Sequence, residues 1–518
     1  MRAILLFVLL LAANAVCAVG KNHVILVVWD GMRPDFVDEQ HTPTLQALAQ
    51  SGVRFLHHHS TYLTATDVNG TALATGMYPE HSNVFANYEW LPAINARQPV
   101  DTSVPENWRI GDRVMDGKYL AVATLPEMMR AAGHSVALAG SKAVAFLFDR
   151  KAEWFTETLQ NKPITVLALS PMAAANRDEM AKRIGAAPAD DKTPAAERNV
   201  YTTRALTDVL WRDGVPEFSL LWLSEPDLSQ HGSAPGSPAA LAAIKSSDEC
   251  LARVLAALQE KGVRDSTDVL VVSDHGFSTI QRSVDLVAML NAAGFHAGRE
   301  FAADAQAGDV LVAGNGGSIL LYVRAHDPAV TTKLVAWLQH RDFAGVLFTR
   351  EKFEGTFPLH AAHIAVATEQ PDIVLSLHWS DDKNRFGTPG LVNGDWNRAP
   401  NFGTHASLSY YDLTNTLVAS GPHFKKTFED DVPTGNIDVA PTVAHIIGVA
   451  AKFDGRVLSE ALRDGSERNA ETRELVATRD FDDGHWQQNL RISTVETTDY
   501  LDEGNGALHA KETPASDR

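Results

Sequence analysis

Long apolar segments that end close to an aspartate constrain the fold of this chain more than any other feature. The clearest of them span residues 23–29, 218–223 and 269–272. Nearly continuous apolar runs of this length are typical of strands buried on both faces, as in parallel sheets that helices cover on each side. An aspartate follows each run within a few residues. We therefore expect these acidic side chains to lie at one edge of a buried sheet.

Segments with helical patterns alternate with the apolar runs. Pro43 suits the first position of a helix, with Thr42 as its N-cap and Gly52 at its end. Longer helices are predicted near residues 239–261 and 439–447. Alternating strands and helices predict an α/β fold with a central, mostly parallel sheet and helices on both faces.

The same patterns divide the chain into a core and two further regions. Residues 19–278 and 401–463 are predicted to form the core. Between them, residues 279–400 are predicted to form an inserted, cap-like α+β region with a strand at 318–323. Residues 464–518 are polar and charged, and we expect a C-terminal extension whose last dozen residues are disordered.

The N-terminus, residues 1–18, has the pattern of a cleaved export signal. Arg2 is followed by an apolar stretch, and small residues precede the predicted cleavage point. The apolar stretch is shorter than the roughly 20 residues that span a bilayer, so no stable membrane insertion is expected. We predict a periplasmic or secreted protein. Removal of Cys17 with the signal would leave Cys250 as the single cysteine, without an intrachain disulfide.

The charge balance limits the partners of the protein. The 518 residues carry a formal net charge of −19, whereas nucleic-acid backbones and anionic membranes are bound by clustered Lys and Arg. We therefore expect no binding of nucleic-acid polymers. An acidic protein can still act on a small phosphorylated substrate when metal ions supply the local positive charge. The sequence does not determine the oligomeric state.

Aspartates and histidines near the predicted strand ends are candidate metal ligands. One Asp–His pair is spaced by four residues, so one helical turn would present both side chains to the same side. Another Asp–His pair follows a buried strand directly. Each residue alone has an ordinary structural alternative, such as capping a turn or packing in the core, so the prediction rests on the whole set. Its members are Asp30, Asp227, His231, Asp274, His275 and His405.

A threonine-rich segment supplies the candidate nucleophile. Residues 67–75 before Gly76 are predicted to form a short helix, which places Thr66 at its N-terminus. A helix N-terminus favours an anion through its free N–H groups and dipole. A threonine hydroxyl is a weak nucleophile near neutral pH and needs a metal ion to hold its alkoxide. Thr64 and Thr71 are the competing hydroxyls, and capping the helix is the alternative role for Thr66.

At these residues the chain resembles the alkaline phosphatase superfamily, most closely its type I phosphodiesterase and nucleotide pyrophosphatase branch. The resemblance runs from Val24 to about Leu458 and is interrupted by residues 279–400. The motifs that carry it are Val28-Trp-Asp-Gly-Met-Arg-Pro-Asp35, Thr75-Gly-Met-Tyr-Pro79, Phe85-Ala-Asn-Tyr88, Glu225-Pro-Asp-Leu-Ser-Gln-His231, Ser273-Asp-His-Gly276, Gly403-Thr-His405 and Ser420-Gly-Pro-His-Phe-Lys425.

The resemblance implies an alkaline-phosphatase-like fold and a site with two Zn²⁺ ions. Asp227, His231 and His405 would bind one ion, while Asp30, Thr66, Asp274 and His275 would bind or contact the other. Thr66 matches the nucleophile of the family, and Asn87 is similar to the residue that helps hold the phosphoryl oxygen.

Three further positions bear on the substrate. Asp67 stands where nucleotide-specific members carry an aromatic residue. Trp222 falls where those enzymes place a pocket tyrosine and would either stack on the substrate or pack in the core. Lys142 would either contact a substrate anion, as in the phosphonoacetate hydrolase branch, or be solvated.

The resemblance therefore implies an exported two-zinc hydrolase of phosphoric esters, of the phosphodiesterase or nucleotide pyrophosphatase type, acting through a phosphothreonyl intermediate. A phosphonoacetate-hydrolase-like enzyme that cleaves a C–P bond, or a phosphomonoesterase, would share the metal site and differ in the pocket. A catalytically inactive module that binds metal or phosphate is the alternative without enzyme activity.

Overall fold

A computed structural model describes residues 22–149, 165–167, 180–188 and 194–511 of the chain. The predicted export signal, residues 1–18, lies outside the described residues. Within the described part, no helix combines the length and the apolar character needed to cross a membrane.

The core is built on a mostly parallel sheet, as predicted. Among the described residues the strand order is β21-β2-β20-β9-β1-β8-β6-β7. β1 lies between β8 and β9 and runs parallel to both, whereas β20 is antiparallel to β9. The bounds in that order are Phe428–Asp430, Val53–Phe55, Leu417–Ser420, Thr267–Val272, His23–Trp29, Phe218–Leu223, Val136–Gly140 and Thr165–Leu167.

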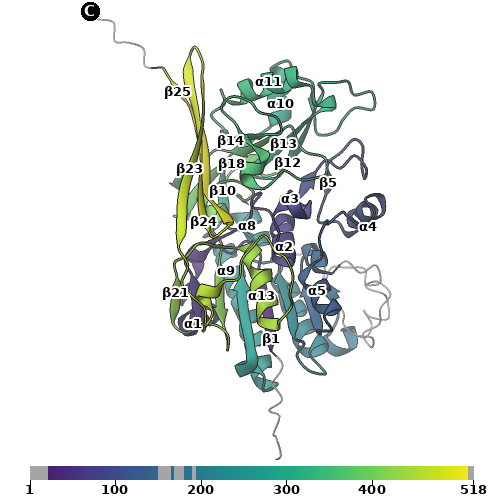
Figure 1. Ribbon diagram of the computed structural model, residues 1–518, viewed down its shortest axis with the longest axis vertical. Coiled ribbons are helices and arrows are strands. Elements are labelled where there is room, and N and C mark those ends of the chain that lie inside the picture. Colours follow the sequence, from purple (N-terminus) through teal and green to yellow (C-terminus); the bar gives the residue numbers. More distant parts are fainter. Residues whose placement is uncertain (1–21, 150–164, 168–179, 189–193, 512–518) are drawn as a thin grey trace, which may run out of the picture.

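Helices cover both faces of this sheet, because alternate side chains of its strands face opposite sides. Leu26 of β1 belongs to the same apolar cluster as Leu73 of α2, whereas the adjacent Val27 clusters with Leu251 of α9. The main helices on the first face are α2 (Thr66–Thr75), α5 (Leu125–Ala131) and α13 (Val439–Ile447), and those on the second are α1 (Pro43–Ser51) and α9 (Pro238–Glu260) (Figure 1).

Helix α1 begins and ends at the predicted residues, but its N-terminus is capped from elsewhere. Thr42 occupies the N-cap position, yet its hydroxyl exchanges hydrogen bonds with the backbone of Asp38. The free N–H groups of Thr44 and Leu45 instead donate to the carboxylate of Asp248 on α9, at 3.0 and 2.9 Å. A tertiary contact therefore replaces the local cap that the sequence predicted.

The inserted region contains a second sheet of order β11-β12-β13-β16-β14-β15, packed on α10 (Leu286–Ala292) and α11 (Pro328–Leu338). In Figure 1 it lies above the core. The bounds of these strands are Ala297–Gly298, Val310–Gly314, Ser318–Val323, Ile373–Leu377, Ala344–Thr349 and Phe357–Pro358.

A third sheet, β17-β18-β10-β19, joins the inserted region to the core. The chain enters through β10 and returns through β19, and these two strands pair with each other. Their pairing brings both crossings to one place beside the core. The bounds are β17 (Trp379–Lys383), β18 (Pro389–Asp395), β10 (Ser278–Val284) and β19 (Gly403–Thr404).

The polar C-terminal segment forms a three-stranded antiparallel sheet, β23 (Ala470–Asp480), β24 (Gly484–Val495) and β25 (Thr498–Ala510). Leu490 and Leu501 join an apolar cluster with Leu320 and Val346 of the inserted sheet. Residues 507–510, which we expected to be disordered, belong to β25. Only one face of these strands is buried, so alternating polar residues lower the overall hydropathy without preventing strand formation.

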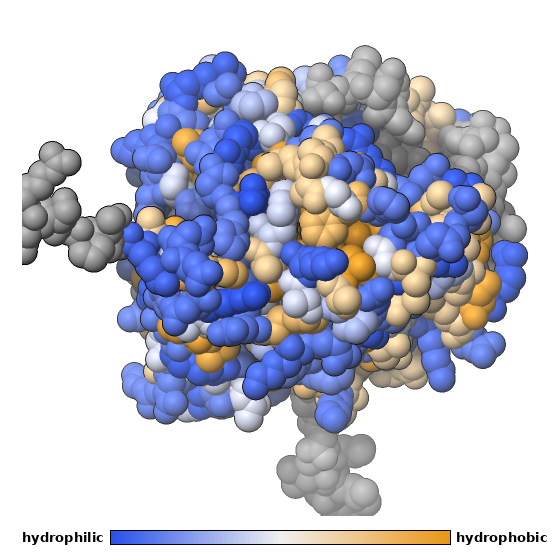
Figure 2. Space-filling model, turned by 90° about the horizontal axis from the view of Figure 1, so that it is seen from above, coloured by the Kyte–Doolittle hydropathy of each residue, from blue (hydrophilic) through white to orange (hydrophobic). Residues whose placement is uncertain are grey.

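Further helices and strands belong to the described part of the chain. They are β3 (His58–His59), α3 (Pro79–Ser82), β4 (Tyr88–Glu89), β5 (Val100–Asp101), α4 (Pro105–Val114), α7 (Ala196–Arg204), α8 (Asp227–Ser233), α12 (Tyr410–Leu413) and β22 (Thr434–Gly435). Seen from the end that carries α10 and α11, the surface is largely hydrophilic around a smaller central apolar area (Figure 2).

Candidate active site

Three neighbouring parallel strands deliver the aspartates to one edge of the central sheet. Asp30 follows β1, Asp227 begins α8 just after β8, and Asp274 follows β9. The backbone N–H of Asp227 donates to the carbonyl oxygen of Asp30 at 2.9 Å, which ties two of these strand ends together. Gly31 allows this approach: its φ is +75°, and a Cβ there would lie 3.2 Å from the Cα of Asp227.

Three histidines turn the same ring nitrogen, Nε2, toward this edge of the sheet. The Nδ1 atoms of His231, His275 and His405 lie 3.0, 2.9 and 2.8 Å from backbone carbonyl oxygens. A carbonyl accepts the Nδ1 proton, so each ring turns Nε2 toward the carboxylates. This orientation is typical of metal-ligating histidines, whose second nitrogen is held by a hydrogen bond.

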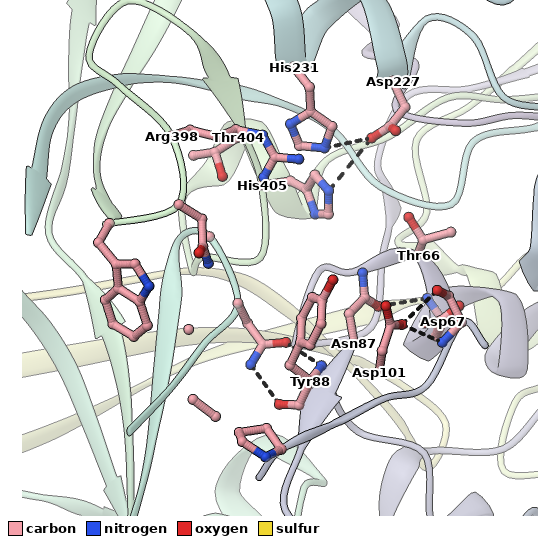
Figure 3. Close-up of a pocket in the computed structure, with 18 of the residues that line it drawn as sticks. Thr66, Asp67, Asn87, Tyr88, Asp101, Asp227, His231, Arg398, Thr404 and His405 are labelled. Atoms are coloured by element: carbon pink, nitrogen blue, oxygen red, sulfur yellow. Dashed lines mark hydrogen bonds and ion pairs between the residues drawn. The ribbon is translucent and has the colours of Figure 1, made fainter. Parts of the chain in front are cut away.

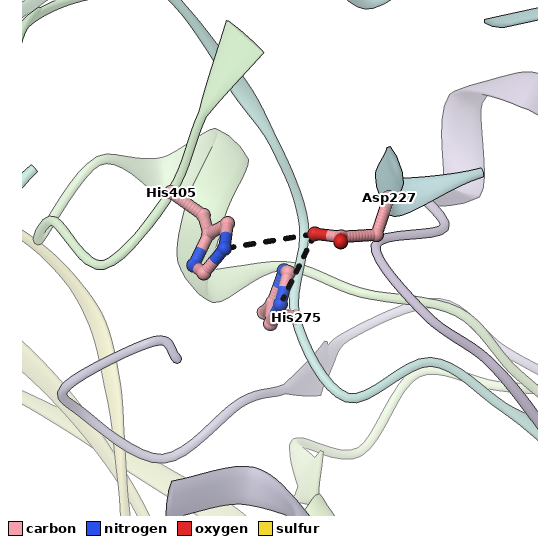
Figure 4. A group of neighbouring side chains, drawn as sticks. All are labelled: Asp227, His275 and His405. Atoms are coloured by element: carbon pink, nitrogen blue, oxygen red, sulfur yellow. Dashed lines mark ion pairs between the residues drawn. The ribbon is translucent and has the colours of Figure 1, made fainter. Parts of the chain in front are cut away.

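The distances define two overlapping groups of ligand atoms. Ligand atoms of Asp227, His275 and His405 lie within 4.8 Å of one another, and so do those of Asp30, Asp274 and His275. Figure 4 shows the first group, in which the Nε2 atoms of His405 and His275 are 3.6 and 4.0 Å from Asp227 Oδ1. The Nε2 of His231 also lies 3.2 Å from Asp227 Oδ1. All six predicted ligands therefore meet at one place.

Unsatisfied oxygen atoms in these groups fit a bound cation. Asp227 Oδ1 and Asp274 Oδ2 are buried, and neither has a hydrogen-bond partner among the described residues. Buried carboxylate oxygens are normally hydrogen-bonded or bound to a metal. Carboxylate oxygens with imidazole nitrogens are a ligand set that Zn²⁺ and similar divalent ions accept. The residues present therefore fit metal binding.

The electrostatics of the site lead to the same conclusion. Burial raises the pKa of Asp274 to about 7, and burial together with the nearby Asp274 raises the pKa of Asp30 well above its usual range. Burial and the neighbouring imidazoles of His275 and His231 hold the pKa of His405 well below its ordinary value. Neutral imidazole is the form that binds metals. A cation would relieve the crowding of carboxylates at this edge.

Thr66 is the threonine hydroxyl that reaches the ligand groups. It is the first residue of α2, and its Oγ1 lies 3.2 Å from His275 Nε2. The hydroxyl of Thr64 donates instead to the carbonyl oxygen of Ser407, and Thr71 is fully buried within α2. Neither competitor lines the cavity described below. The position of Thr66 is therefore the one suited to a nucleophile.

Asn87 lies beside the N-terminus of α2. Its Oδ1 accepts a hydrogen bond from the backbone N–H of Asp67 at 3.0 Å. This contact turns the amide nitrogen toward the space between Thr66 and His405, as Figure 3 shows. A donor in this position is suited to holding a phosphoryl oxygen.

Lys142 is part of the site and is not a solvated side chain. It follows β6, and its Nζ lies 3.0 Å from Asp30 Oδ1, 2.8 Å from Asp227 Oδ2 and 3.1 Å from Thr66 Oγ1. Burial acts to lower the pKa of Lys142, but the carboxylates of Asp227 and Asp30 outweigh it and raise this pKa. A permanent positive charge therefore links the two groups of ligands beside the threonine.

Trp222 does not stack on a substrate, contrary to one of the two roles expected for it. Its side chain is 0% exposed and packs against Gly70 of α2 and the ring of Phe148. Its indole Nε1 donates to Asp30 Oδ2 at 2.8 Å. The strand position that suggested a pocket residue places Trp222 beneath the ligands, where it orients one of them.

A cavity of about 710 Å³ opens over these residues and is shared by two regions of the chain. Tyr88 and Asp101 line it from the core, whereas Trp396 and Arg398 line it from the inserted region (Figure 3). None of these four residues was predicted from the sequence to line the site. Tyr88 adjoins Asn87 and could have been found from that motif, but the other three lie in segments without a recognisable local pattern.

Asp67 lies next to the nucleophile candidate but is held away from solvent. Its side chain is fully buried, and its Oδ2 accepts a hydrogen bond from the hydroxyl of Thr102 at 2.8 Å. Burial raises the pKa of Asp67 to about 7. The base-stacking aromatic that the family pattern places here is therefore replaced by a buried acid.

Fold and site together define a class of protein. Acidic and imidazole ligands at the ends of parallel strands, beside a threonine at a helix N-terminus, form the arrangement of a metal-dependent phosphoryl-transfer enzyme. The chain belongs to the type I phosphodiesterase/nucleotide pyrophosphatase family, whose sequence model matches residues 24–398.

Similar curated proteins come from the same family. The chain is 23% identical over 274 residues to the mouse ectonucleotide pyrophosphatase/phosphodiesterase family member 3, an alignment that covers 51% of this chain and 26% of the mouse protein. It is 21% identical over 275 residues to venom phosphodiesterase 2 of Crotalus adamanteus, covering 28% of that protein. The chain thus spans little more than a quarter of these relatives. Family member 7 of Rattus norvegicus matches over 86% of this chain and 88% of its own length at 23% identity.

Solved structures share the fold. The human ectonucleotide pyrophosphatase/phosphodiesterase 5 superposes with a TM-score of 0.58 at 16% identity, covering 85% of this chain and 100% of the other. An inactive variant of the murine enzyme in complex with AMP gives a TM-score of 0.57 with the same identity and coverage. These similarities confirm the predicted alkaline-phosphatase-like fold.

Proposed function

We propose that this protein is an exported hydrolase of phosphoric diesters or pyrophosphates that uses two zinc ions and a phosphothreonyl intermediate. The observation that carries the proposal is the place of Thr66. Its Oγ1 lies within 3.2 Å of His275 Nε2 and 3.1 Å of Lys142 Nζ, beside both groups of ligands. Family membership supports the same reaction class.

Each side chain of the site has a separate role in this proposal. Asp227, His231 and His405 would hold one ion, and Asp30, Asp274 and His275 the other. Bound ions would supply Lewis-acid stabilisation of the negative charge on the reacting oxygens. Lys142 stabilises the deprotonated oxygen of Thr66 through its adjacent ammonium. Asn87 donates to a phosphoryl oxygen, and Trp222 keeps Asp30 in place by binding its second oxygen.

The reaction itself is a double displacement at phosphorus. Thr66 Oγ1 forms a bond to phosphorus while the bond to the leaving oxygen breaks, which releases an alcohol or phosphate. Water then attacks phosphorus from the vacated side, and its bond replaces the bond to Thr66. The proton that Thr66 gives up in the first step balances the one gained by the departing oxygen. In the second step one proton of the water returns to Thr66 Oγ1, and the other is lost to solvent as the released phosphoric ester ionises.

The substrate is less constrained than the chemistry. Nucleotide-type substrates fit the family and the AMP complex of a structural neighbour, but Asp67 replaces the aromatic residue of nucleotide-specific members. Tyr88 is 42% exposed and lines the cavity, so it can provide a surface for stacking in a different place. We therefore propose a small phosphoric diester or pyrophosphate without requiring a nucleoside.

One preparation of the full chain tests this proposal. Zinc content is measured first, and turnover is then compared for an aryl phosphate diester, a nucleotide ester, a phosphomonoester and phosphonoacetate. Acid quenching during turnover followed by mass spectrometry should find phosphate on Thr66. A preference for the monoester or phosphonoacetate, or a phosphate on another residue, would contradict the proposal. N-terminal sequencing of the mature protein separately tests export.

A further inference from the structure

An arginine from the inserted region reaches the metal-ligand side of the cavity. Arg398 lies between β18 and β19, and its guanidinium points toward His231 and His405 in Figure 3. The inserted region therefore places a fixed positive charge next to ligands supplied by the core.

The Arg398 guanidinium differs from other arginines near the cavity because it has no close partner. Within the described part of the chain, no hydrogen bond or ion pair reaches its guanidinium nitrogens, although its charge is felt by Asp395 and Tyr88. Arg299 lines the same cavity but pairs with Asp285 at 3.4 Å and stacks on Trp396 at 4.5 Å. Arg398 thus keeps its planar array of donors available for an anion.

The position of Arg398 fixes which part of a substrate it would meet, provided the proposed function holds. Attack by Thr66 requires the departing group to leave on the far side of phosphorus, roughly in line with the attacking oxygen. Thr66 Oγ1 lies 3.2 Å from His275 Nε2, so we expect the far side to face the group formed by Asp227, His231 and His405. The Arg398 guanidinium points toward two members of that group in Figure 3. The departing group would therefore lie against this guanidinium.

The opposite wall of the cavity has the reverse charge. Asp101 lines the cavity beside Tyr88, and with burial its carboxylate raises the pKa of Tyr88 to about 12. An anionic group retained on phosphorus would be repelled there, whereas an anionic departing group would meet Arg398. The two walls of the cavity therefore carry opposite charges, and they favour different ends of a substrate.

We propose that Arg398 selects substrates whose departing group carries its own oxyanion, a carboxylate or a phosphate. The substrate class is a phosphoric diester or pyrophosphate with an anionic leaving group and an uncharged or cationic group retained on phosphorus. The inference rests on the proposed hydrolase function, and it adds a specificity residue from the inserted region. Arg398 contacts the substrate and takes no part in the bond changes.

A matched pair of substrates tests this selection. Both are phenyl phosphate diesters with a para-nitrophenyl leaving group that carries a ring carboxylate in one case and the methyl ester of that carboxylate in the other. The wild-type protein should prefer the carboxylate by about tenfold in kcat/KM. Arg398→Gln should remove this preference while changing the methyl ester by less than about twofold, and Arg398→Lys should retain part of it.

Arg385→Gln is the matched control. Arg385 is an exposed arginine of the inserted region outside the cavity, so its substitution changes the net charge equally and should leave the preference intact. A wild-type protein without the preference, equal losses on both substrates in Arg398→Gln, or the same effect in Arg385→Gln would overturn the inference. Thermal unfolding of each variant establishes that it is folded.

A binding measurement separates this inference from the proposed function. The free carboxylated nitrophenol is titrated calorimetrically into the zinc-loaded protein, and Arg398→Gln should weaken its binding about tenfold relative to the methyl ester. Turnover of neither diester by the wild-type protein would overturn the proposed function, and the titration alone would then decide the role of Arg398. Unchanged binding in Arg398→Gln would overturn that role.

Discussion

The floor and the rim of the cavity are built in contrasting ways. The floor consists of the metal-ligand candidates at the strand ends, where Asp30 and Asp274 are 0% exposed. The rim consists of Tyr88, Asp101 and Arg398, which lie in loops or short strands of two regions. Buried strand ends hold the chemical groups in fixed positions, whereas the rim can change without disturbing them. The contrast explains how one reaction can serve different substrates.

The strongest test of the floor is Thr66→Ala. Loss of the nucleophile should lower turnover by about four orders of magnitude or more, while metal analysis should still find the wild-type zinc content. Thr71→Ala is the control, because its hydroxyl lies in the same helix without a hydrogen-bond partner among the described residues. Undiminished turnover in Thr66→Ala would place the nucleophile elsewhere.

Removing a ligand should have a different signature from removing the nucleophile. Asp227→Ala should lose one metal ion per chain and about three orders of magnitude in turnover, because a ligand atom and its charge are both removed. Elemental analysis of the purified variant measures the first effect. Asp342→Ala, at an exposed position, should change neither quantity. Full zinc occupancy in Asp227→Ala would contradict its role.

A smaller effect on metal affinity and turnover is expected from Trp222, which lies beneath the ligands of the floor. Trp222→Phe keeps the packing but removes the N–H group that donates to Asp30 Oδ2, so metal affinity or turnover should fall by about tenfold to a hundredfold. The matched control is Trp211→Phe, whose buried indole donates to Ser219 Oγ instead. If both variants behave alike in a metal titration, the effect of Trp222 is one of packing and not of ligand orientation.

The smallest predicted effect concerns a contact that joins the inserted region, the core and the C-terminal sheet. His363 Nδ1 lies 2.6 Å from Glu80 Oε1, and its Nε2 lies 3.8 Å from Asp499 Oδ2. Burial acts to lower the pKa of His363, but its interactions with Asp499 and Glu80 outweigh it and raise this pKa to about 9. The folded state therefore binds the proton more tightly than the unfolded state.

The pH dependence of stability follows from that direction. The stabilisation that protonated His363 provides should be complete below the pKa of about 6.5 that this histidine has in the unfolded chain. It should disappear as the pH rises through about 9. His363→Asn suits the positive φ of 55° at this position and should cost roughly 2 kcal/mol at pH 6 but little at pH 10. Urea unfolding at both pH values measures the difference. An equal loss at both would show that packing, not charge, is responsible.

Local patterns in the sequence determined the central strands, the helices around them and the residues that gather at the strand ends. The strand limits 23–29 and 218–223 were predicted correctly because a fully buried strand requires an uninterrupted apolar run. Thr66 could be singled out because the helix that follows it is visible in the sequence. The candidate metal ligands share an edge because parallel neighbours end on the same side.

Only the tertiary structure decided which contacts the remaining side chains make. Trp222 faces Asp30 and not the cavity, Lys142 lies between two aspartates from distant segments, and Arg398 reaches the ligands of another region. The C-terminal strands likewise bury one face against the inserted sheet despite their polar composition. These outcomes depend on how distant segments pack, and periodicity and spacing report only on neighbours along the chain.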